Sequence, residues 1–343
     1  MPDREAPASY GDPAAEHAAV RGATGIVERS DRGLLEVTGR DRAKFLHALL
    51  SNDIASLAPG QGRGATLLDV HGKVQVLLRV LALDDRLLVV TPPGDAARTQ
   101  EALDTYLFSE KASFEDVTGT RAIVMLAGPE AAAMAERLAG ARPGDEAWSH
   151  VAATIGGAPV RLVRGGGETG EPEVWIVSAT DDGPAVWDAA IGAGARPFGR
   201  VAFESLRVEA GAAAFPDDMG PTVLLPEVPF ADLVAQTKGC YIGQEVIVRI
   251  RDRGHVNRLL RGLLIEGDRV PAPGTQVLTD DNAIVGLITS AVWSYSLKRP
   301  IALAFVRRQH AEAGTAVAVR TEDATVAATV SDLPFVQSAA SAR

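Results

Sequence analysis

The hydrophobic pattern of this chain changes near Gly254, and the change limits the folds that the chain can adopt. Before that point, apolar stretches with the spacing of strands and of helices alternate along the sequence. After it, short apolar runs separated by turn residues extend from Leu259 to Val330, a pattern typical of a small barrel. We therefore predict an α+β body that carries an all-β C-terminal domain, with the boundary within residues 251–258.

The length of 343 residues agrees with this division, because one hydrophobic core rarely grows beyond about 250–300 residues. The first residues are rich in Ala, Pro and small polar side chains, which favours a loose segment. We expect a flexible N-terminal tail over residues 1–19, a body over 20–250, a β-barrel over 256–336 and a tail over 337–343. In the body, Val74–Leu83 and Leu87–Thr91 flank turn residues, which predicts a hairpin.

Composition narrows the classes of partner. Lys and Arg number 34 against 44 Asp and Glu, so the net charge is −10 and nucleic acid would need a local basic patch. No apolar stretch reaches the roughly 18–20 residues of a membrane span, and the start lacks the pattern of a signal peptide. The single cysteine, Cys240, allows no intrachain disulfide and cannot complete a zinc or iron–sulfur site. We expect a cytoplasmic protein without a membrane partner.

The most unusual stretch is Lys238-Gly239-Cys240-Tyr241-Ile242-Gly243-Gln244-Glu245. A lysine near a thiol favours the thiolate, which is the reactive form, and glycines let the backbone approach a ligand closely. One interpretation is a reactive thiol beside a ligand. The other is a buried cysteine in a tight turn, with Lys238 and Glu245 merely exposed. The residues alone leave both open.

A basic run follows this stretch. If it forms a strand, Arg249, Arg251 and Arg253 share one face, because alternate strand residues point the same way. Such a face would receive a carboxylate tail, an RNA phosphate or an acidic partner, or it would be a solvated sheet edge protected by charge. The six histidines show no metal-ligand spacing, so we predict no resident metal site.

The octapeptide resembles the K-G-C-[FY]-x-G-Q-E motif of the YgfZ family, folate-binding relatives of the glycine-cleavage T-protein. Further motifs occur in the family's order, from about residue 25 to residue 336. They are Asn52-Asp53, Leu206-Arg207-Val208-Glu209-Ala210-Gly211, Leu225-Pro226-Glu227 and Leu333-Pro334-Phe335. The resemblance implies a T-protein-like, three-lobed α+β fold around a central folate opening, with an all-β C-terminal barrel.

The resemblance also implies tetrahydrofolate, or a one-carbon derivative of it, as the cofactor. The candidate folate contacts are Asn52, Arg207, Glu209, Tyr241, Gly243, Gln244, Glu245 and Arg249. Cys240 and Lys238 are the candidate catalytic pair, and Cys240 is at most a transient metal ligand. A salt bridge or helix-end contact explains Arg207 and Glu209 equally well, since a guanidinium fork fits a structural carboxylate as readily as that of a folate.

Two positions depart from the aminomethyltransferase pattern. Val76 and Leu77 stand where the transferase motif G-G-x-x-D-D places two aspartates, and an alkyl group cannot accept a proton or bind an amine. Trp175 stands where the motif T-G-E-x-G-[FY]-E ends in the glutamate that binds the pterin. These departures argue against glycine cleavage, whereas folate binding is still expected.

The function that the resemblance implies is folate-dependent iron–sulfur cluster assembly or repair, including the clusters of tRNA-modifying enzymes. Cys240 would be its key thiol, and the partners would be folate and iron–sulfur assembly or client proteins. One alternative is a tetrahydrofolate-dependent aminomethyl- or methyltransferase. The second alternative is a non-catalytic module that binds tRNA or a protein through Arg249, Arg251 and Arg253.

Overall fold

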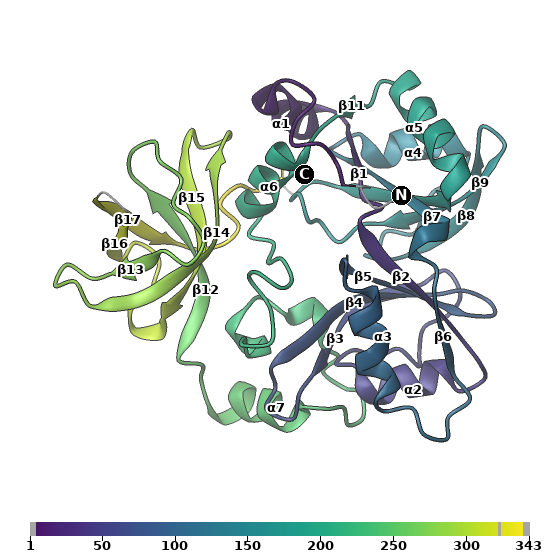
Figure 1. Cartoon of the computed structure of the whole chain (residues 1–343), viewed down its shortest axis with the longest axis horizontal. Coiled ribbons are helices and arrows are strands. Elements are labelled where there is room, and N and C mark those ends of the chain that lie inside the picture. Colours follow the sequence, from purple (N-terminus) through teal and green to yellow (C-terminus); the bar gives the residue numbers. More distant parts are fainter. Residues whose placement is uncertain (1–4, 322–323, 339–343) are drawn as a thin grey trace.

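The computed structural model describes residues 5–321 and 324–338. It contains three lobes, each built on its own sheet, as Figure 1 shows. The all-β lobe lies on one side of the molecule, the two α+β lobes lie on the other, and helix α6 (Arg200–Glu209) runs between them (Figure 1). The three-lobed fold with a C-terminal barrel is thereby confirmed. No helix in the described part of the chain is long and apolar enough to cross a membrane.

The first lobe is a five-stranded sheet in the order β3-β4-β5-β2-β6. Its strands are β2 (Arg32–Thr38), β3 (Gly62–Leu68), β4 (Val74–Ala82), β5 (Leu87–Pro93) and β6 (Ser113–Asp116). Helices α2 (Arg42–Leu49) and α3 (Ala96–Asp104) pack their apolar side chains on one face of it. The predicted hairpin is confirmed, since β4 and β5 pair antiparallel from Arg79 opposite Val90 to Ala82 opposite Leu87.

The second lobe is a six-stranded sheet in the order β11-β1-β7-β10-β9-β8. Its strands are β1 (Gly25–Glu28), β7 (Arg121–Ala127), β8 (His150–Ile155), β9 (Ala158–Arg164), β10 (Glu173–Ala179) and β11 (Arg196–Pro197). Alternate residues point to opposite faces. Val124 and Ile176 therefore pack with α4 (Ala131–Ala139) and α5 (Gly183–Gly192), whereas Met125 and Trp175 pack with side chains of the first lobe.

The third lobe is a closed six-stranded barrel in the order β12-β15-β14-β13-β16-β17. Its strands are β12 (Arg258–Ile265), β13 (Gln276–Leu278), β14 (Ile284–Ser294), β15 (Arg299–Arg307), β16 (Ala316–Arg320) and β17 (Thr325–Ser331). Each strand coincides with one of the short apolar runs of the sequence. The predicted barrel is confirmed, because every run is flanked by turn residues and contributes alternate side chains to the core.

Two segments differ from the prediction. The flexible tail is wrong from Pro13 onward, because helix α1 (Pro13–Gly22) begins there, and Asp12 caps it by accepting from the backbone N–H groups of Ala14 and Ala15. Residues 1–4 and 339–343 of the two predicted tails lie outside the described residues. The basic run is a helix, α7 (Gln244–Arg253), and not a strand. Short 3₁₀ turns lie at Thr118–Thr120, Thr180–Asp182, Leu225–Glu227, Ala231–Leu233 and Arg308–His310.

Candidate functional site

A cavity of about 410 Å³ lies where the two α+β lobes meet the segment that follows α6. Its walls come from β1, β2, β4, the loop before β10, α6 and residues 211–233. This volume is within the range of about 300–1,000 Å³ that is usual for small-molecule sites. We call it the central cavity. Apolar side chains such as Leu77 and Phe203 share its walls with several arginines and carboxylates, which suits a ligand with both ring surface and charge.

Strand β4 brings two side chains to the cavity. Leu77 and Arg79 line it, because residues two apart in a strand share a face. Val76 and Leu78 point the other way, into the core of the first lobe. Residues 76 and 77 are the two positions that lack the transferase aspartates. Of these two described residues, only residue 77 faces the cavity. Its leucine supplies apolar surface there and no proton-accepting group.

Glu168 lies at the centre of a group of buried arginines in this cavity. Arg32 Nη2 donates to both carboxylate oxygens of Glu168, at 2.7 and 2.9 Å, and Arg29 Nη1 donates at 3.1 Å. Burial raises the pKa of Glu168, but the charges of Arg32, Arg29 and Arg79 outweigh burial and lower that pKa to about 2. Glu168 is therefore ionised at neutral pH and accepts hydrogen bonds rather than protons.

A second buried carboxylate, Glu173, lies beside Glu168. It accepts hydrogen bonds from the backbone N–H of Thr169 at 2.6 Å, from the Thr169 hydroxyl at 2.9 Å and from the N–H of Gly167 at 3.2 Å. Burial, together with the charge of Glu168, raises the pKa of Glu173. Trp175, two residues further along β10, is buried in the contact between the α+β lobes, and its indole N–H has no partner among the described residues.

Trp148 forms part of the cavity wall in a backbone conformation that bulky residues rarely adopt, with φ at +67°. Its ring meets that of Trp175 edge-on, with centroids 5.3 Å apart, and the guanidinium of Arg79 lies 5.1 Å from it. The Gly165–Gly167 turn makes room for the indole, because a Cβ on Gly166 would lie 2.5 Å from a ring carbon of Trp148. Backbone strain of this kind is concentrated at functional sites.

Of the site residues proposed from the sequence, Arg207 lines this cavity. Its guanidinium is already engaged, since it donates to Glu204, Asp218, Ser290 and the carbonyl of Ala212. The Arg207 Nη1 to Asp218 distance is 2.8 Å, and the side chain of Asp218 is fully buried. These contacts favour the structural interpretation of Arg207, because its donors hold α6 to the barrel and to the following segment.

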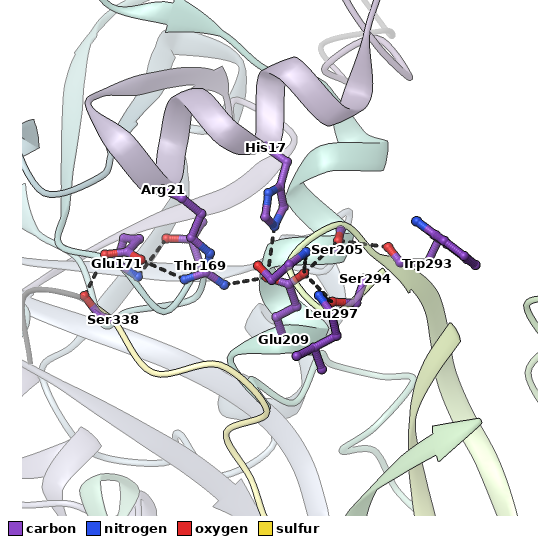
Figure 2. Close-up of polar contacts among 11 residues, drawn as sticks. His17, Arg21, Thr169, Glu171, Ser205, Glu209, Trp293, Ser294, Leu297 and Ser338 are labelled. Atoms are coloured by element: carbon purple, nitrogen blue, oxygen red, sulfur yellow. Dashed lines mark hydrogen bonds and ion pairs between the residues drawn. The ribbon is translucent and has the colours of Figure 1, made fainter. Parts of the chain in front are cut away.

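Glu209 belongs to a different cluster, which Figure 2 shows. Its carboxylate accepts from Arg21 at 2.7 Å, from His17 at 2.9 Å and from the hydroxyls of Ser294 and Ser296 at 2.6 and 2.8 Å. Arg21 also donates to Glu171, which accepts from Ser338 (Figure 2). Glu209 thereby joins α1, α6 and the barrel, so its geometry favours a structural role.

Lys238 and Asn52 meet at the end of α2. The ammonium of Lys238 donates to the backbone carbonyls of His47, Leu50 and Asn52. The Asn52 side chain donates to the carbonyls of Gly64 at 2.8 Å and Asp232 at 2.9 Å. Both side chains donate to backbone carbonyls, which belong to the helix end, to the edge strand β3 and to neighbouring loops. Lys238 is thus directed at carbonyl oxygens.

The rest of the octapeptide packs against the turn between β3 and β4. Tyr241 is buried in the core that this turn shares with the barrel, and Gly243, at φ +78°, precedes the first residue of α7. Gln244 accepts from the N–H of Tyr241 at 3.3 Å, and Glu245 is exposed. Cys240 is also exposed, so the interpretation as a buried cysteine is wrong. None of these five residues is among the described residues that line the central cavity.

The face shared by Arg249, Arg251 and Arg253 does not exist, because these residues lie on α7 and helical neighbours share a face at spacings of three or four. Arg249 and Arg253 therefore lie together, and both are exposed. Arg251 points elsewhere and pairs with Asp252 at 2.6 Å. The strand prediction fails because a 3.6-residue repeat of Val246, Ile247 and Ile250 toward the protein also fits this segment.

The sequence analysis missed Arg29, Arg32, Arg79, Trp148 and Glu168. A signal existed for Arg79, because it is the single charge in a strand that is apolar apart from Gln75, and a charge there must face a partner or a site. Arg29 and Arg32 flank a turn between two apolar strands, which is a weaker signal. Trp148 and Glu168 lie on loops, and the sequence of these loops has no periodic pattern that would predict where their side chains point.

Comparison with known proteins gives matches over nearly the whole chain. The GCVT N-terminal domain matches residues 4–238, and the glycine cleavage T-protein C-terminal barrel domain matches residues 258–337. An aminomethyltransferase of Frankia alni is 35% identical over 307 residues, which cover 88% of this chain and 83% of that protein. A probable aminomethyltransferase of Halobacterium salinarum is 33% identical over 344 residues, which cover 94% of this chain and 90% of that protein.

A solved structure shares the fold. The crystal structure of the glycine cleavage system aminomethyltransferase T from Bartonella henselae superposes with a TM-score of 0.87. The two chains are 24% identical, and the match covers 97% of this chain and 92% of the other. All three lobes therefore have counterparts in that protein.

Proposed function

Because this chain belongs to the glycine cleavage T-protein family, we propose that it binds tetrahydrofolate in the central cavity and serves a folate-dependent one-carbon transfer other than glycine cleavage. The observation that carries the proposal is the cavity itself. It lies at the meeting of the α+β lobes, has a volume of about 410 Å³, and combines apolar walls with buried charge. The relatives are named aminomethyltransferases, which supports a transferase more than any other class.

The residues of the cavity fit a reduced folate. Trp148, Phe203 and Leu77 supply flat or apolar surface for a ring system. Glu168 is ionised and would accept hydrogen bonds from ring N–H groups. Arg32 and Arg79 each have an Nε atom without a partner among the described residues. When bound, tetrahydrofolate would supply the nitrogen atoms that carry a one-carbon unit.

The side chains of this cavity would bind and orient a ligand, but the side chain at the position of the transferase aspartate cannot transfer a proton. Leu77 has no acidic or basic atom, and Glu168 stays ionised under the influence of Arg32 and Arg29. The cavity therefore lacks, at residue 77, the acid–base group that aminomethyl transfer from glycine needs. We expect folate binding without substantial turnover in a reconstituted glycine-cleavage assay.

Titration of the purified protein with tetrahydrofolate tests the binding claim. Trp148 lies in the cavity wall. Trp187, on α5, packs against Tyr10 and is not among the described lining residues. Binding should quench tryptophan fluorescence saturably, and the Trp148→Phe variant should lose most of the change while the matched Trp187→Phe variant keeps it. Absence of saturable binding at millimolar ligand, in fluorescence and in calorimetry, would refute the proposal.

A second candidate function is iron–sulfur cluster assembly or repair, as in the YgfZ family that the octapeptide resembles. The observation that favours it is the exposure of Cys240, which leaves the thiol accessible to a partner protein in a reducing compartment such as the cytoplasm. Arg249 and Arg253, together on α7, would meet an anionic partner such as tRNA.

The Cys240→Ser variant tests this candidate. Because Cys240 is exposed, the variant should keep its stability within about 0.5 kcal/mol. In cells that depend on the protein, it should lower the activity of iron–sulfur enzymes while folate binding stays unchanged. Wild-type activity of those enzymes in the variant strain would remove Cys240 from the account.

A further inference from the structure

Arg79 is the least neutralised of the three arginines around Glu168. Its Nη2 atom is 3.7 Å from the nearest Glu168 oxygen, which is beyond hydrogen-bond reach. Its Nε atom has no partner within residues 5–321 and 324–338. The side chain is only 13% exposed, and Trp148 covers it on one side. No described residue accepts a hydrogen bond from this guanidinium, so its donors are available to a group bound in the cavity.

Arg79 has the longest carboxylate contact of the three arginines. Glu168 lies within 4.0 Å of all three guanidiniums, and Asp31 lies 3.7 Å from Arg29. In the described part of the chain, these are the two carboxylates that form ion pairs with the three arginines. Glu173 is also nearby, but among the described residues it lies within 4.0 Å of none of these guanidiniums, and its carboxylate accepts from Thr169 and Gly167 instead. Asp232 also lines the cavity and its charge favours the charged form of Arg79, although no oxygen of its carboxylate lies within 4.0 Å of Arg79 in the described part of the chain. Arg79 therefore has no carboxylate within hydrogen-bond distance among the described residues, which is costly for a buried charge.

We propose that Arg79 and Arg32 form a subsite for a carboxylate group of the ligand that occupies the central cavity. A carboxylate would supply the negative charge that Arg79 lacks at hydrogen-bond distance, and its two oxygens match the planar fork of a guanidinium. Both arginines line the cavity and retain unpartnered Nε donors. Burial, with the charge of Arg29, lowers the pKa of Arg32 to about 10, and a bound carboxylate would reverse this effect.

The carboxylate has two possible sources. It belongs either to the glutamate of the folate, in which case the inference rests on the proposed function, or to a separate small amino-acid substrate that shares the cavity with the folate. Three probes separate these sources. Tetrahydrofolate carries the glutamate, tetrahydropteroate has the same ring system without the glutamate, and N-methylglycine is a small amino acid with a free carboxylate.

The experiment measures the affinity of each probe by calorimetry for the wild type and three variants. Arg79→Met removes the charge and keeps the length of the side chain. Arg79→Lys keeps the charge but loses the fork. The matched control is Arg63→Met, since Arg63 lies on the neighbouring strand β3 opposite Val80, away from the described cavity lining. Arg79→Met should not lower the melting temperature, because burial, and to a lesser degree the charge of Arg29, disfavours the charged form of Arg79 and lowers its pKa.

Loss of a charged hydrogen bond predicts about 10- to 100-fold weaker binding of the carboxylate probe by Arg79→Met, and a smaller loss by Arg79→Lys. If Arg79→Met binds only tetrahydrofolate more weakly, the carboxylate is that of the folate glutamate. If the variant binds only N-methylglycine more weakly, the carboxylate belongs to a separate substrate. Equal affinities of Arg79→Met and the wild type for every probe, or an equal loss for tetrahydropteroate, overturn the subsite. Wild-type protein that binds N-methylglycine but neither folate refutes the proposed function and leaves the subsite standing, and failure to bind any probe refutes both.

Discussion

Glu168 and Leu77 show how single side chains set the chemistry of the central cavity. Glu168 keeps its charge because two arginines donate to it, so a proton reaches it only in strong acid. Leu77 faces the same space without any polar atom. The cavity can therefore hold a ring system and an ionic group, but residue 77 cannot exchange protons with a substrate. This pairing underlies the proposal of binding without glycine cleavage.

The pKa of Glu168 leads to a prediction about acid stability. A carboxylate whose pKa is lowered from 4.5 to about 2 in the folded state contributes stability above pH 4.5 and loses it as the pH falls toward 2. The full contribution corresponds to about 3 kcal/mol. We expect the stability difference between the wild type and Glu168→Gln to be largest near neutral pH and to shrink between pH 4.5 and 2. Urea midpoints measured across this range check it, and parallel curves for the two proteins would contradict it.

At the level of single residues, the sequence analysis found the unusual octapeptide but not the reason for its composition. Lys238 serves the carbonyls at the end of α2, and Gly243 meets a backbone requirement. Both roles depend on neighbours far along the chain, so spacing within the motif could not show them. The three arginines around Glu168 come from β2, β4 and the turn after β1. Only the fold brings them together.

Helix α7 begins at a position that requires glycine. Gly243 has φ at +78°, and a Cβ there would lie 2.5 Å from the carbonyl oxygen of Asp69. Gly239, in the same octapeptide, has open space around it. We predict that Gly243→Ala destabilises the protein by about 1–3 kcal/mol. The matched variant Gly239→Ala should stay within about 0.5 kcal/mol of the wild type in chemical denaturation. Similar losses in both variants would show that α7 does not need its glycine.

Elements with a clear hydrophobic period could be predicted from the sequence. The barrel strands and the β4–β5 hairpin agree with the structure, because turn residues define their ends. Helices α1 and α7 could not be assigned, for different reasons. The small residues of α1 resemble those of a loose segment, although Asp12-Pro13 is a helix start. The charges of α7 also fit a strand edge, and only packing against the β3–β4 turn decides between the two.

At the scale of the whole molecule, Glu209 ties the barrel to the rest of the chain. Its carboxylate accepts from Arg21 and His17 of α1 and from Ser294, the last residue of β14 (Figure 2). It also accepts from Ser296, which follows that strand. Glu209→Gln removes the charge that these donors share, so we predict a loss of about 3–5 kcal/mol in the free energy of unfolding. The control is Glu204→Gln on the same helix, whose carboxylate is 44% exposed and should contribute about 1 kcal/mol or less.

Differential scanning calorimetry shows whether Glu209 couples the unfolding of the barrel to that of the body or acts only locally. If Glu209 couples the lobes, the variant should unfold at a lower temperature with the barrel and body transitions separated. A single transition at the wild-type temperature would mean that Glu209 contributes little to holding the lobes together.

The position of bound tetrahydrofolate tests the central claim most directly. We predict that a crystal structure of the complex, grown from protein saturated with tetrahydrofolate, shows the folate in the central cavity, against Leu77 and Trp148 and within hydrogen-bond distance of Glu168. Folate density at the Lys238–Glu245 segment instead, or an empty cavity at saturating ligand, would contradict the account.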